Sequence, residues 1–315
     1  MIGVCGEALI DMVVRPDGSL LARPGGAAFN TSRTLARLGW PVTYLGRLAD
    51  DGFGALLRDS LSRDGVRLGV SELSADPTTL AVVDLDDAGS PRFRFYLAGT
   101  SAPSLDHGAL TAALPADLTA LHAGSLALTM EPIASALEVL ITRDLPPDVI
   151  VMVDPNCRPS AIADKAAYRE RLFRILRRAD IVKVSAEDLA YLFPGLPLTA
   201  AATELTEWSA PALVLVTDGP RPARALLPSR ESVAVDVPVV EVADTIGAGD
   251  AFGGAFLGSI VDSGQGASGQ GASRLGASGL NRATPVRAAL QLAVRVAALT
   301  CTRVGAEPPW RHELA

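Results

Sequence analysis

Short apolar runs rich in β-branched residues alternate with longer stretches of helical pattern along most of this chain. Such alternation is the signature of βαβ units, in which parallel strands form a central sheet and helices cover its two faces. The sequence therefore predicts an α/β fold with a central, mostly parallel sheet. We expect strands from residue 3 onward and at 42–45, 121–123, 149–153, 181–184 and 213–217. We expect helices at 28–38, 53–63, 132–142, 165–178, 186–193 and 288–300.

Segments at about 12–21 and 79–97 do not follow this rhythm. In the second, apolar and polar residues alternate on both sides of an Asp-Asp-Ala-Gly-Ser turn signal at 86–90. The pattern predicts a β-hairpin with one solvent-facing side, to which residues 12–21 could add another extended piece. A small sheet inserted into an α/β domain can close over a site as a lid, whereas an ordinary edge hairpin is the simpler alternative.

The charge balance argues against several classes of partner. The formal net charge is −7 over 315 residues, and binding nucleic acid requires a cationic surface, so we expect no nucleic-acid partner. No uncharged apolar run reaches the roughly 18–20 residues of a membrane span. The apolar N-terminus carries Glu7 and Asp11, which is typical of a buried strand and not of a signal peptide.

The cysteines indicate a reducing compartment. Cys5, Cys157 and Cys301 are too few and too scattered for a disulfide framework, and they have no metal-binding spacing. We therefore expect a cytoplasmic protein.

Residues 263–279 form a low-complexity repeat of Gly, Ser and Ala (GQGAS, GQGAS, RLGAS). This composition buries too little apolar surface to order itself. We predict a flexible surface loop between two helices, without a chemical role.

The most informative motif is Asp-Thr-Ile-Gly-Ala-Gly-Asp at 244–250, which follows a β-like run at 233–242 and opens a helical pattern at 251–261. Glycines at 247 and 249 allow a tight turn with amide groups pointing inward. The unpaired amides of the following helix and its positive dipole end add to this. The motif predicts an anion hole for phosphoryl oxygens.

Asp250 is an unusual residue inside an anion hole, because its charge would repel a phosphate. Accepting the proton of an attacking hydroxyl group would explain its presence. Asp is also a favoured helix N-cap, and for an isolated motif of this kind simple capping is the more common explanation.

Other nucleotide motifs are absent from the sequence. There is no Gly-x-x-x-x-Gly-Lys-Ser/Thr sequence, and Phe252 stands where the dinucleotide fingerprint would need its third glycine. A second candidate site is Gly-Gly-Ala-Ala-Phe-Asn at 25–30, where paired glycines permit close approach of a ligand and Asn30 offers both donor and acceptor. Asp11, at the end of the first apolar run, could accept hydrogen bonds from two hydroxyl groups of a sugar. A tight turn with a locally bonded Asn is the simpler alternative for 25–30.

These motifs together resemble the two signature regions of the pfkB (ribokinase-like) carbohydrate kinase family. The first region is 25–39 followed by Gly-x-x-x-Asp-Asp-x-x-Gly at 46–54, the second is 244–252, and both occur in the family's order. The stretches Gly-Glu-Ala-Leu-Ile-Asp at 6–11 and Asp-Pro-Asn-Cys-Arg-Pro at 154–159 look most like fructokinase-type members.

The resemblance implies a ribokinase-like three-layer α/β/α domain over residues 1–315 with a small β-sheet lid. It also implies ATP-dependent phosphorylation of a primary hydroxyl of a small sugar, with fructose as the first candidate.

The implied residues fall into four sets. Catalysis involves Asp250 as the base, with an anion hole from the amides of Gly247, Ala248 and Gly249. The sugar is held by Asp11, Gly26 and Asn30, with Arg158 near the sugar or the transferred phosphate. The nucleotide lies against Thr217, Asp218, Gly219 and Gly249. A K⁺ ion is expected near Asp244 and the carbonyl of Ile246.

The chain departs from the family pattern at the magnesium motif. The family's Asn-x-x-Glu falls on Ser185 and Asp188. Either Asp188 reaches Mg²⁺ through water or Glu187 takes its place, since Mg²⁺ keeps several waters in most sites.

Two further departures concern the ligand pockets. Pro222 replaces a usual glycine of the nucleotide loop, and Leu97 with Ala102-Pro103 replaces the Arg and Ala-Asp usual after the lid of fructokinases. Because the second difference touches the sugar pocket, 2-keto-3-deoxygluconate, ribose or a nucleoside stays open as the acceptor. A binding protein without catalysis is an alternative of another class, and pairing of lids in a homodimer is open as well.

Overall fold

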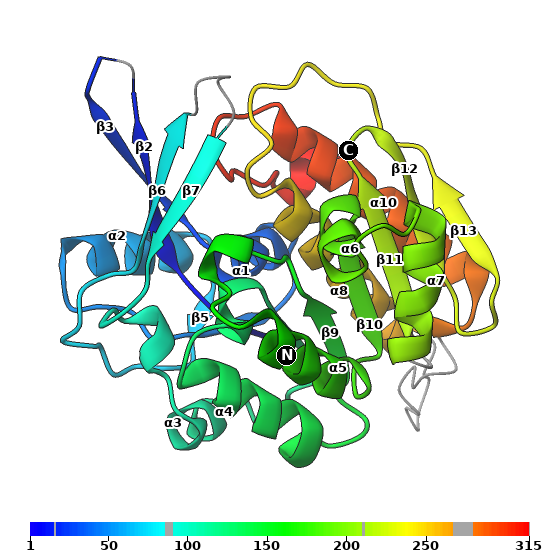
Figure 1. Ribbon diagram of the computed structural model, residues 1–315, viewed down its shortest axis with the longest axis horizontal. Coiled ribbons are helices and arrows are strands. Elements are labelled where there is room, and N and C mark those ends of the chain that lie inside the picture. The colour runs from blue at the N-terminus through cyan, green and yellow to red at the C-terminus, as the bar shows by residue number, and fades with distance from the viewer. Residues whose placement is uncertain (16, 86–90, 210–211, 267–279, 315) are drawn as a thin grey trace.

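The computed structural model describes residues 1–15, 17–85, 91–209, 212–266 and 280–314 (Figure 1). Its centre is a nine-stranded sheet with the order β13-β12-β11-β10-β9-β8-β1-β4-β5. Neighbouring strands from β11 to β5 are parallel, and β12 and β13 add an antiparallel hairpin at one edge. The strands are β1 (Ile2–Cys5), β4 (Val42–Leu45), β5 (Arg67–Leu68), β8 (Ala120–Gly124), β9 (Ile150–Asp154), β10 (Ile181–Ser185), β11 (Leu213–Asp218), β12 (Arg221–Leu226) and β13 (Ser232–Val235). The prediction of a central, mostly parallel sheet is confirmed.

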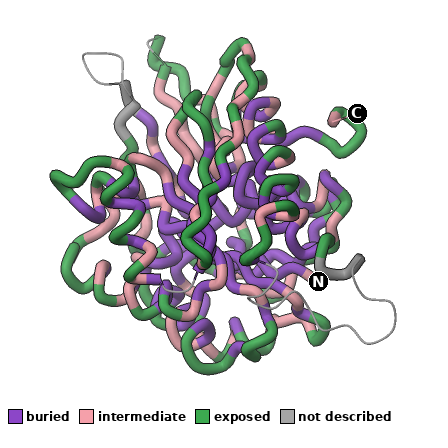
Figure 2. Tube along the Cα trace, turned by 90° about the vertical axis from the view of Figure 1, so that its right-hand side faces the viewer, coloured by how far each residue is buried: buried purple, intermediate pink, exposed green. Residues whose placement is uncertain are grey.

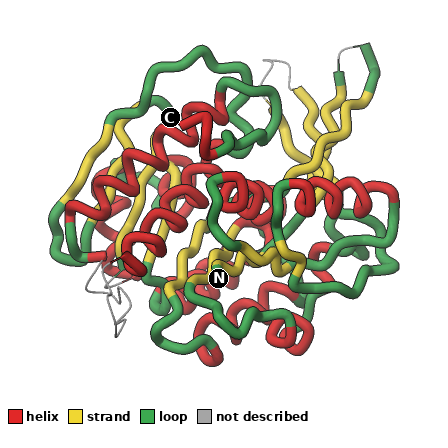
Figure 3. Tube along the Cα trace, turned by 180° about the vertical axis from the view of Figure 1, so that it is seen from behind, coloured by secondary structure: helices red, strands yellow, loops and turns green. Residues whose placement is uncertain are grey.

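Helices cover both faces of this sheet, as Figures 1 and 3 show from opposite sides. One face carries α1 (Ala27–Arg37), α2 (Gly52–Arg63), α8 (Ala248–Gly266) and α10 (Ala283–Cys301). The other carries α3 (His107–Ala112), α4 (Ile133–Val139), α5 (Lys165–Leu176), α6 (Ala186–Leu192) and α7 (Leu198–Ser209).

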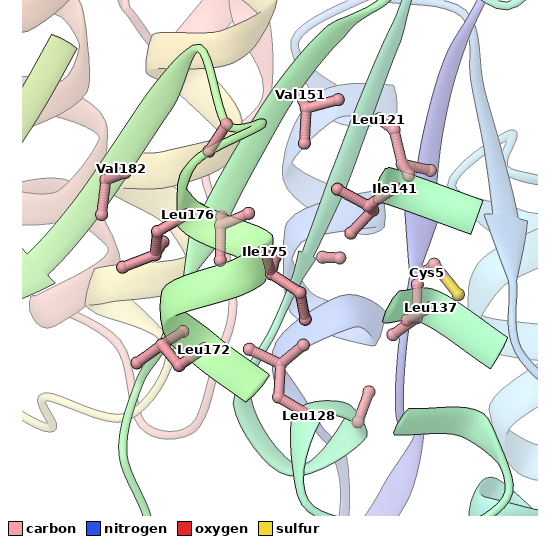
Figure 4. Close-up of a cluster of buried hydrophobic side chains, with 14 of the residues drawn as sticks. Cys5, Leu121, Leu128, Leu137, Ile141, Val151, Leu172, Ile175, Leu176 and Val182 are labelled. Atoms are coloured by element: carbon pink, nitrogen blue, oxygen red, sulfur yellow. The ribbon is translucent and has the colours of Figure 1, made fainter. Parts of the chain in front are cut away.

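Two hydrophobic cores result, one on each face, because successive strand residues point to opposite sides. On β9, Val151 belongs to the core under α4 and α5, whereas Met152 belongs to the core under α8. Figure 4 shows part of the core under α4 and α5, with Val151 and Val182 from the strands and Leu172 and Ile175 from α5. Buried residues fill the centre of the molecule in Figure 2 and exposed ones its periphery.

A second sheet of four strands projects from one end of the molecule (Figure 1). Its order is β3-β2-β6-β7, with β2 and β6 parallel and the two outer pairs antiparallel. The strands are β2 (Leu9–Val14), β3 (Leu20–Gly25), β6 (Leu80–Leu85) and β7 (Pro91–Tyr96). The sequence segments 12–21 and 79–97 fall on this sheet, and the turn expected at 86–90 lies outside the described residues.

For the segments just before and just after the phosphate motif, the structure differs from the prediction. The β-like run at 233–242 is a strand only in β13, after which the chain forms a loop in which Val239 is fully exposed. Pro238 has no amide hydrogen to continue a ladder, and β13 pairs only with β12 on its inner side. The helix α8 continues to Gly266, so it takes in residues 263–266 of the expected flexible loop, and 267–279 lie outside the described residues.

In the part of the chain that the structure describes, no helix has the length and apolar character needed to cross a membrane.

Candidate active site

A cavity of about 700 Å³ lies between the second sheet and the carboxyl ends of the central strands. Its wall includes Asp11 from β2, Phe95 from β7, Lys183 from β10, Thr217 from β11 and the loop that enters α8. Ligands of open α/β folds bind at this end of the strands, because the connecting loops and helix N-termini meet there. All the residues predicted for catalysis, sugar binding and nucleotide binding line this one cavity.

The phosphate motif forms a tight turn at the cavity wall. Gly247 has φ of 76°, and a Cβ atom there would lie 2.5 Å from Cβ of Ala306, so glycine is required on both counts. The helix α8 begins at Ala248, and its first turn borders the cavity. The Ala248 amide donates to the Thr245 carbonyl at 3.3 Å, which closes the turn. A helix N-terminus in this place offers amide donors and positive dipole charge to an anion.

Asp250 lies in the first turn of α8 and faces the cavity instead of capping its helix. Its Oδ2 accepts a 2.8 Å hydrogen bond from Nδ2 of Asn30 in α1. Burial raises the pKa of Asp250, while the Asn30 hydrogen bond and the charges of Lys183 and Arg158 oppose that rise. The carboxylate is therefore held in place by a side chain from another helix.

The predicted sugar-binding residues lie next to Asp250. Oδ1 of Asn30 is buried and has no hydrogen-bond partner in the described part of the protein, so it is available to a ligand hydroxyl. Asp11 faces the same space, where burial and the charge of Asp250 raise its pKa to about 7 against the lowering effect of Arg158.

Close packing explains the paired glycines. A Cβ atom at Gly25 would lie 2.1 Å from Oδ2 of Asp11, and one at Gly26 would lie 2.6 Å from the Glu7 carbonyl oxygen. Gly26 also has φ of 106°, a conformation that other residues rarely adopt. The turn therefore places backbone and carboxylate in contact at the cavity wall.

The predicted nucleotide residues also line this cavity. Thr217, Asp218 and Gly219 stand where β11 ends, and Asp218 binds Arg221 with an Oδ1–Nη2 distance of 2.7 Å. Apolar side chains complete this wall. They come from the loop after β13 (Val237, Val239, Val240, Val242) and from α10 (Val294, Ala297, Ala298). An apolar slot beside polar loop ends suits a planar base.

Lys183 is a site residue that the sequence reasoning missed. Its Nζ binds Oδ2 of Asp154 at 2.9 Å, both side chains are buried, and a Cβ atom at Gly249 would lie only 3.0 Å from Nζ. The buried ammonium group of Lys183 thus packs against the phosphate turn at Gly249. The signal was available in the sequence, because Lys183 is a charged residue in an otherwise apolar strand and one of only two lysines in the chain.

The two acidic residues of the magnesium motif point to different places. Asp188 is buried and accepts hydrogen bonds from the Cys157 amide at 2.6 Å and from the amide and hydroxyl of Ser185 at 2.8 Å each. The bond from the Ser185 amide and a 3.0 Å bond from the Asp188 amide to the Ser185 hydroxyl oxygen together make a capping box for α6. Glu187 is exposed and lines the cavity, so its carboxylate fits a water-mediated contact with a hydrated cation.

Asp244 joins the phosphate turn to the segment after α10. Its Oδ1 accepts from the Ile246 amide at 3.0 Å and its Oδ2 from the Gly305 amide at 2.8 Å. The described residues contain no cluster of three or more His, Cys, Asp or Glu side chains that could hold a metal by themselves. A cation at this point would therefore depend largely on backbone carbonyls.

Comparison with known proteins gives consistent results. A fructokinase of Rhizobium leguminosarum bv. trifolii is 36% identical over 267 residues, covering 82% of this chain and 79% of its own. The structure of a Xylella fastidiosa fructokinase with bound ATP superposes with a TM-score of 0.83 at 30% identity, covering 97% of this chain and 93% of the other. A Vibrio cholerae fructokinase in a fructose-, ADP- and calcium-bound form has a TM-score of 0.79 at 25% identity, covering 97% and 94%.

The central sheet, the second sheet and the cavity between them are those of a carbohydrate kinase, an enzyme that transfers phosphate to a sugar hydroxyl. The chain belongs to the pfkB family of carbohydrate kinases, because that family's model matches residues 2–313. The predicted family and fold are confirmed.

Proposed function

We propose that this protein transfers the γ-phosphoryl group of ATP to a primary hydroxyl of fructose, with Asp250 as the general base. The observation that carries the proposal is the position of the Asp250 carboxylate, buried at the entrance of α8 and bonded to Asn30 on the sugar side. The names of the relatives support fructose as the acceptor.

The sugar docks first against Asp11, the backbone of Gly26 and Oδ1 of Asn30, and the nucleotide lies along the ends of β10 and β11. Asp250 takes the proton of the hydroxyl group as its oxygen attacks the γ-phosphorus, and ADP leaves on the opposite side. Amides of the 247–249 turn meet the charge that spreads over the phosphoryl oxygens. The residues supply alignment and fixed donors, which is most of what phosphoryl transfer needs.

Two cations belong to the proposal. Glu187 would hold Mg²⁺ through water, because both oxygens of Asp188 are occupied by hydrogen bonds, and the ion would neutralise phosphate charge on ATP. A K⁺ ion would take the carbonyl of Ile246 and a remaining lone pair of Asp244 beside the phosphate turn.

The second sheet acts in this proposal as a lid over the sugar. Phe93 and Phe95 on β7 both line the cavity, so closure would exclude water that competes with the sugar as acceptor. The lid carries exposed apolar side chains, Leu20 at 59% and Tyr96 at 51%, through which two subunits could pair. A cytoplasmic location stays a prediction from the three free cysteines.

The test is ADP release, measured with a coupled assay over a panel of acceptors. We expect release to depend on fructose above the other sugars. Higher turnover with 2-keto-3-deoxygluconate, ribose or a nucleoside would move the proposal to that acceptor, and no acceptor-dependent release at all would contradict catalysis.

A further inference from the structure

The N-terminus of α1 lacks a cap of its own. Gly26 occupies the N-cap position and has no side chain to accept a hydrogen bond. The first amides of a helix have no partner inside it, and leaving them unpaired in a buried place is costly. Glu7, 20 residues before Ala27, supplies acceptors for two of these amides. Its Oε1 accepts from the Ala27 amide at 3.1 Å, and its carbonyl oxygen accepts from the Phe29 amide at 3.3 Å.

The second oxygen of Glu7 binds a different element. Oε2 accepts from the Ala127 amide at 3.3 Å, in the turn that follows β8, and the Ser125 side chain also bonds to this carboxylate. Ser125 has φ of 55°, so this turn holds a non-glycine residue in a conformation that needs outside support. A single carboxylate, 1% exposed and lining the cavity, thus ties the start of α1 to the end of β8.

We infer that Glu7 is a positioning residue for phosphoryl transfer: it fixes the entrance of α1 so that Asn30 meets Asp250 and the Gly26 backbone meets the sugar. The inference rests on the proposed function. Asn30 lies one turn into α1, and its amide bonds to the Gly26 carbonyl at 2.9 Å, so a shift of the helix entrance moves Asn30 with it. A displacement of about 1 Å in such a constellation can cost roughly 100-fold in rate.

The charge of Glu7 also acts on the base. Burial raises the pKa of Glu7 to about 7, and the charge of Asp250 adds to this rise. The hydrogen bonds of the Glu7 carboxylate act in the opposite direction. Coupling between two sites is reciprocal, so an ionised Glu7 disfavours ionisation of Asp250. The other groups that interact electrostatically with Asp250 are Asn30 from α1, Asp154 from β9, Arg158 after β9, Lys183 from β10 and Asp11 from β2.

The test compares Glu7→Gln with Asp64→Asn as a matched control. Gln keeps the shape of Glu and one acceptor but presents an amide group to the second donor. Asp64 is an equally buried carboxylate that holds the other end of α1, accepting from Nε of Arg33 at 2.6 Å and Nε of Arg37 at 2.8 Å. Both variants remove one charge that supports α1, but only Glu7 is next to the cavity.

For Glu7→Gln we expect kcat/KM for the sugar to fall roughly 10–100-fold while KM for ATP stays unchanged. Asp64→Asn should lower the melting temperature without changing the sugar dependence. A Glu7→Gln enzyme with wild-type kcat/KM for the sugar would overturn the inference.

Calorimetric titration with fructose and amide hydrogen exchange give readouts that do not need turnover. Glu7→Gln should weaken fructose binding and speed exchange at Ala27 and Ala127, whereas unchanged binding and exchange would contradict the role of Glu7. If the wild-type protein binds fructose but releases no ADP with it, the proposed function fails while this test of Glu7 still stands.

Discussion

The side-chain amide of Asn30 donates a 2.8 Å hydrogen bond to the carboxylate of Asp250, which links the first turns of α1 and α8 across 220 residues of sequence. This contact joins the residues proposed to bind the sugar to the turn proposed to bind phosphate. Asn30 keeps its other polar atom, Oδ1, without a partner in the described residues, so the same side chain can bind both Asp250 and a ligand hydroxyl.

The pH dependence of the reaction should reflect the buried base. Burial raises the pKa of Asp250, so activity should be present when the carboxylate is ionised and lost as pH falls through this raised value. Lys183 lowers the same pKa, and Lys183→Met should therefore move the acid limb of kcat/KM to higher pH. The variant should also melt at a lower temperature, because Asp154 loses its buried partner at a cost of about 3–5 kcal/mol.

Lys165→Met is the control for that measurement. Lys165 is the other lysine of the chain, exposed at the start of α5 and stacked on Tyr191. Its removal should leave the acid limb in place. Equal shifts in both lysine variants would show a general charge effect instead of a local one.

Asp11→Ala should raise KM for the sugar strongly, since two hydroxyl groups lose their acceptor, and it should leave KM for ATP unchanged. A loss of about 1.5–3 kcal/mol, the usual range for a hydrogen bond to a charged group, corresponds to roughly 10–200-fold. Asp17→Ala, on the exposed turn of the same hairpin, is the matched control. If only KM for ATP changed, the sugar and nucleotide assignments of the two parts of the cavity would have to be exchanged.

Glu187→Gln and Asp188→Asn should separate metal handling from folding. Because Glu187 faces the cavity, its loss should raise the Mg²⁺ concentration needed for half-maximal rate while the melting temperature stays near wild type. Asp188→Asn should instead lower the melting temperature, since a carboxylate with three donors loses its charge. If only Asp188→Asn changed the Mg²⁺ requirement, the assignment to Glu187 would be wrong.

Gly249→Val should abolish turnover, since its side chain would fill the space between the phosphate turn and Nζ of Lys183, 3.0 Å from a Cβ atom at that position. Gly52→Ala serves as the control, because a Cβ atom there meets nothing within 4 Å. Circular dichroism should show both variants folded. If the Gly249→Val enzyme were active, the assignment of the phosphate site to this turn would be wrong.

Much of the architecture could be predicted from sequence because periodicity and turn chemistry are local. The strand predicted at 42–45 matches β4. The tight turn and the helix that follows it could be predicted from Gly247, Gly249 and Asp250. The helix α7 was missed, since its stripe of Ala201, Ala202 and Leu205 is weakly apolar.

Contacts between distant elements could not be predicted in the same way. Asn30 and Asp250 were each selected as site residues, but nothing in the sequence indicates that they touch. Glu7 and Lys183 sit inside apolar strand patterns, where burial hides a charged residue until its partners are known. Motif position pointed to Asp188 or Glu187 for magnesium, but it did not indicate that the Asp188 carboxylate takes part in the capping box of α6.

The most direct test of the account is the fructose-dependent turnover of Asp250→Asn, an isosteric change that removes the base and keeps a partner for Asn30. We expect a kcat about 10²–10⁴-fold below wild type, with KM for ATP little changed and the fold intact. A variant that turns over fructose at a near-normal rate would contradict the assignment of Asp250 as the base.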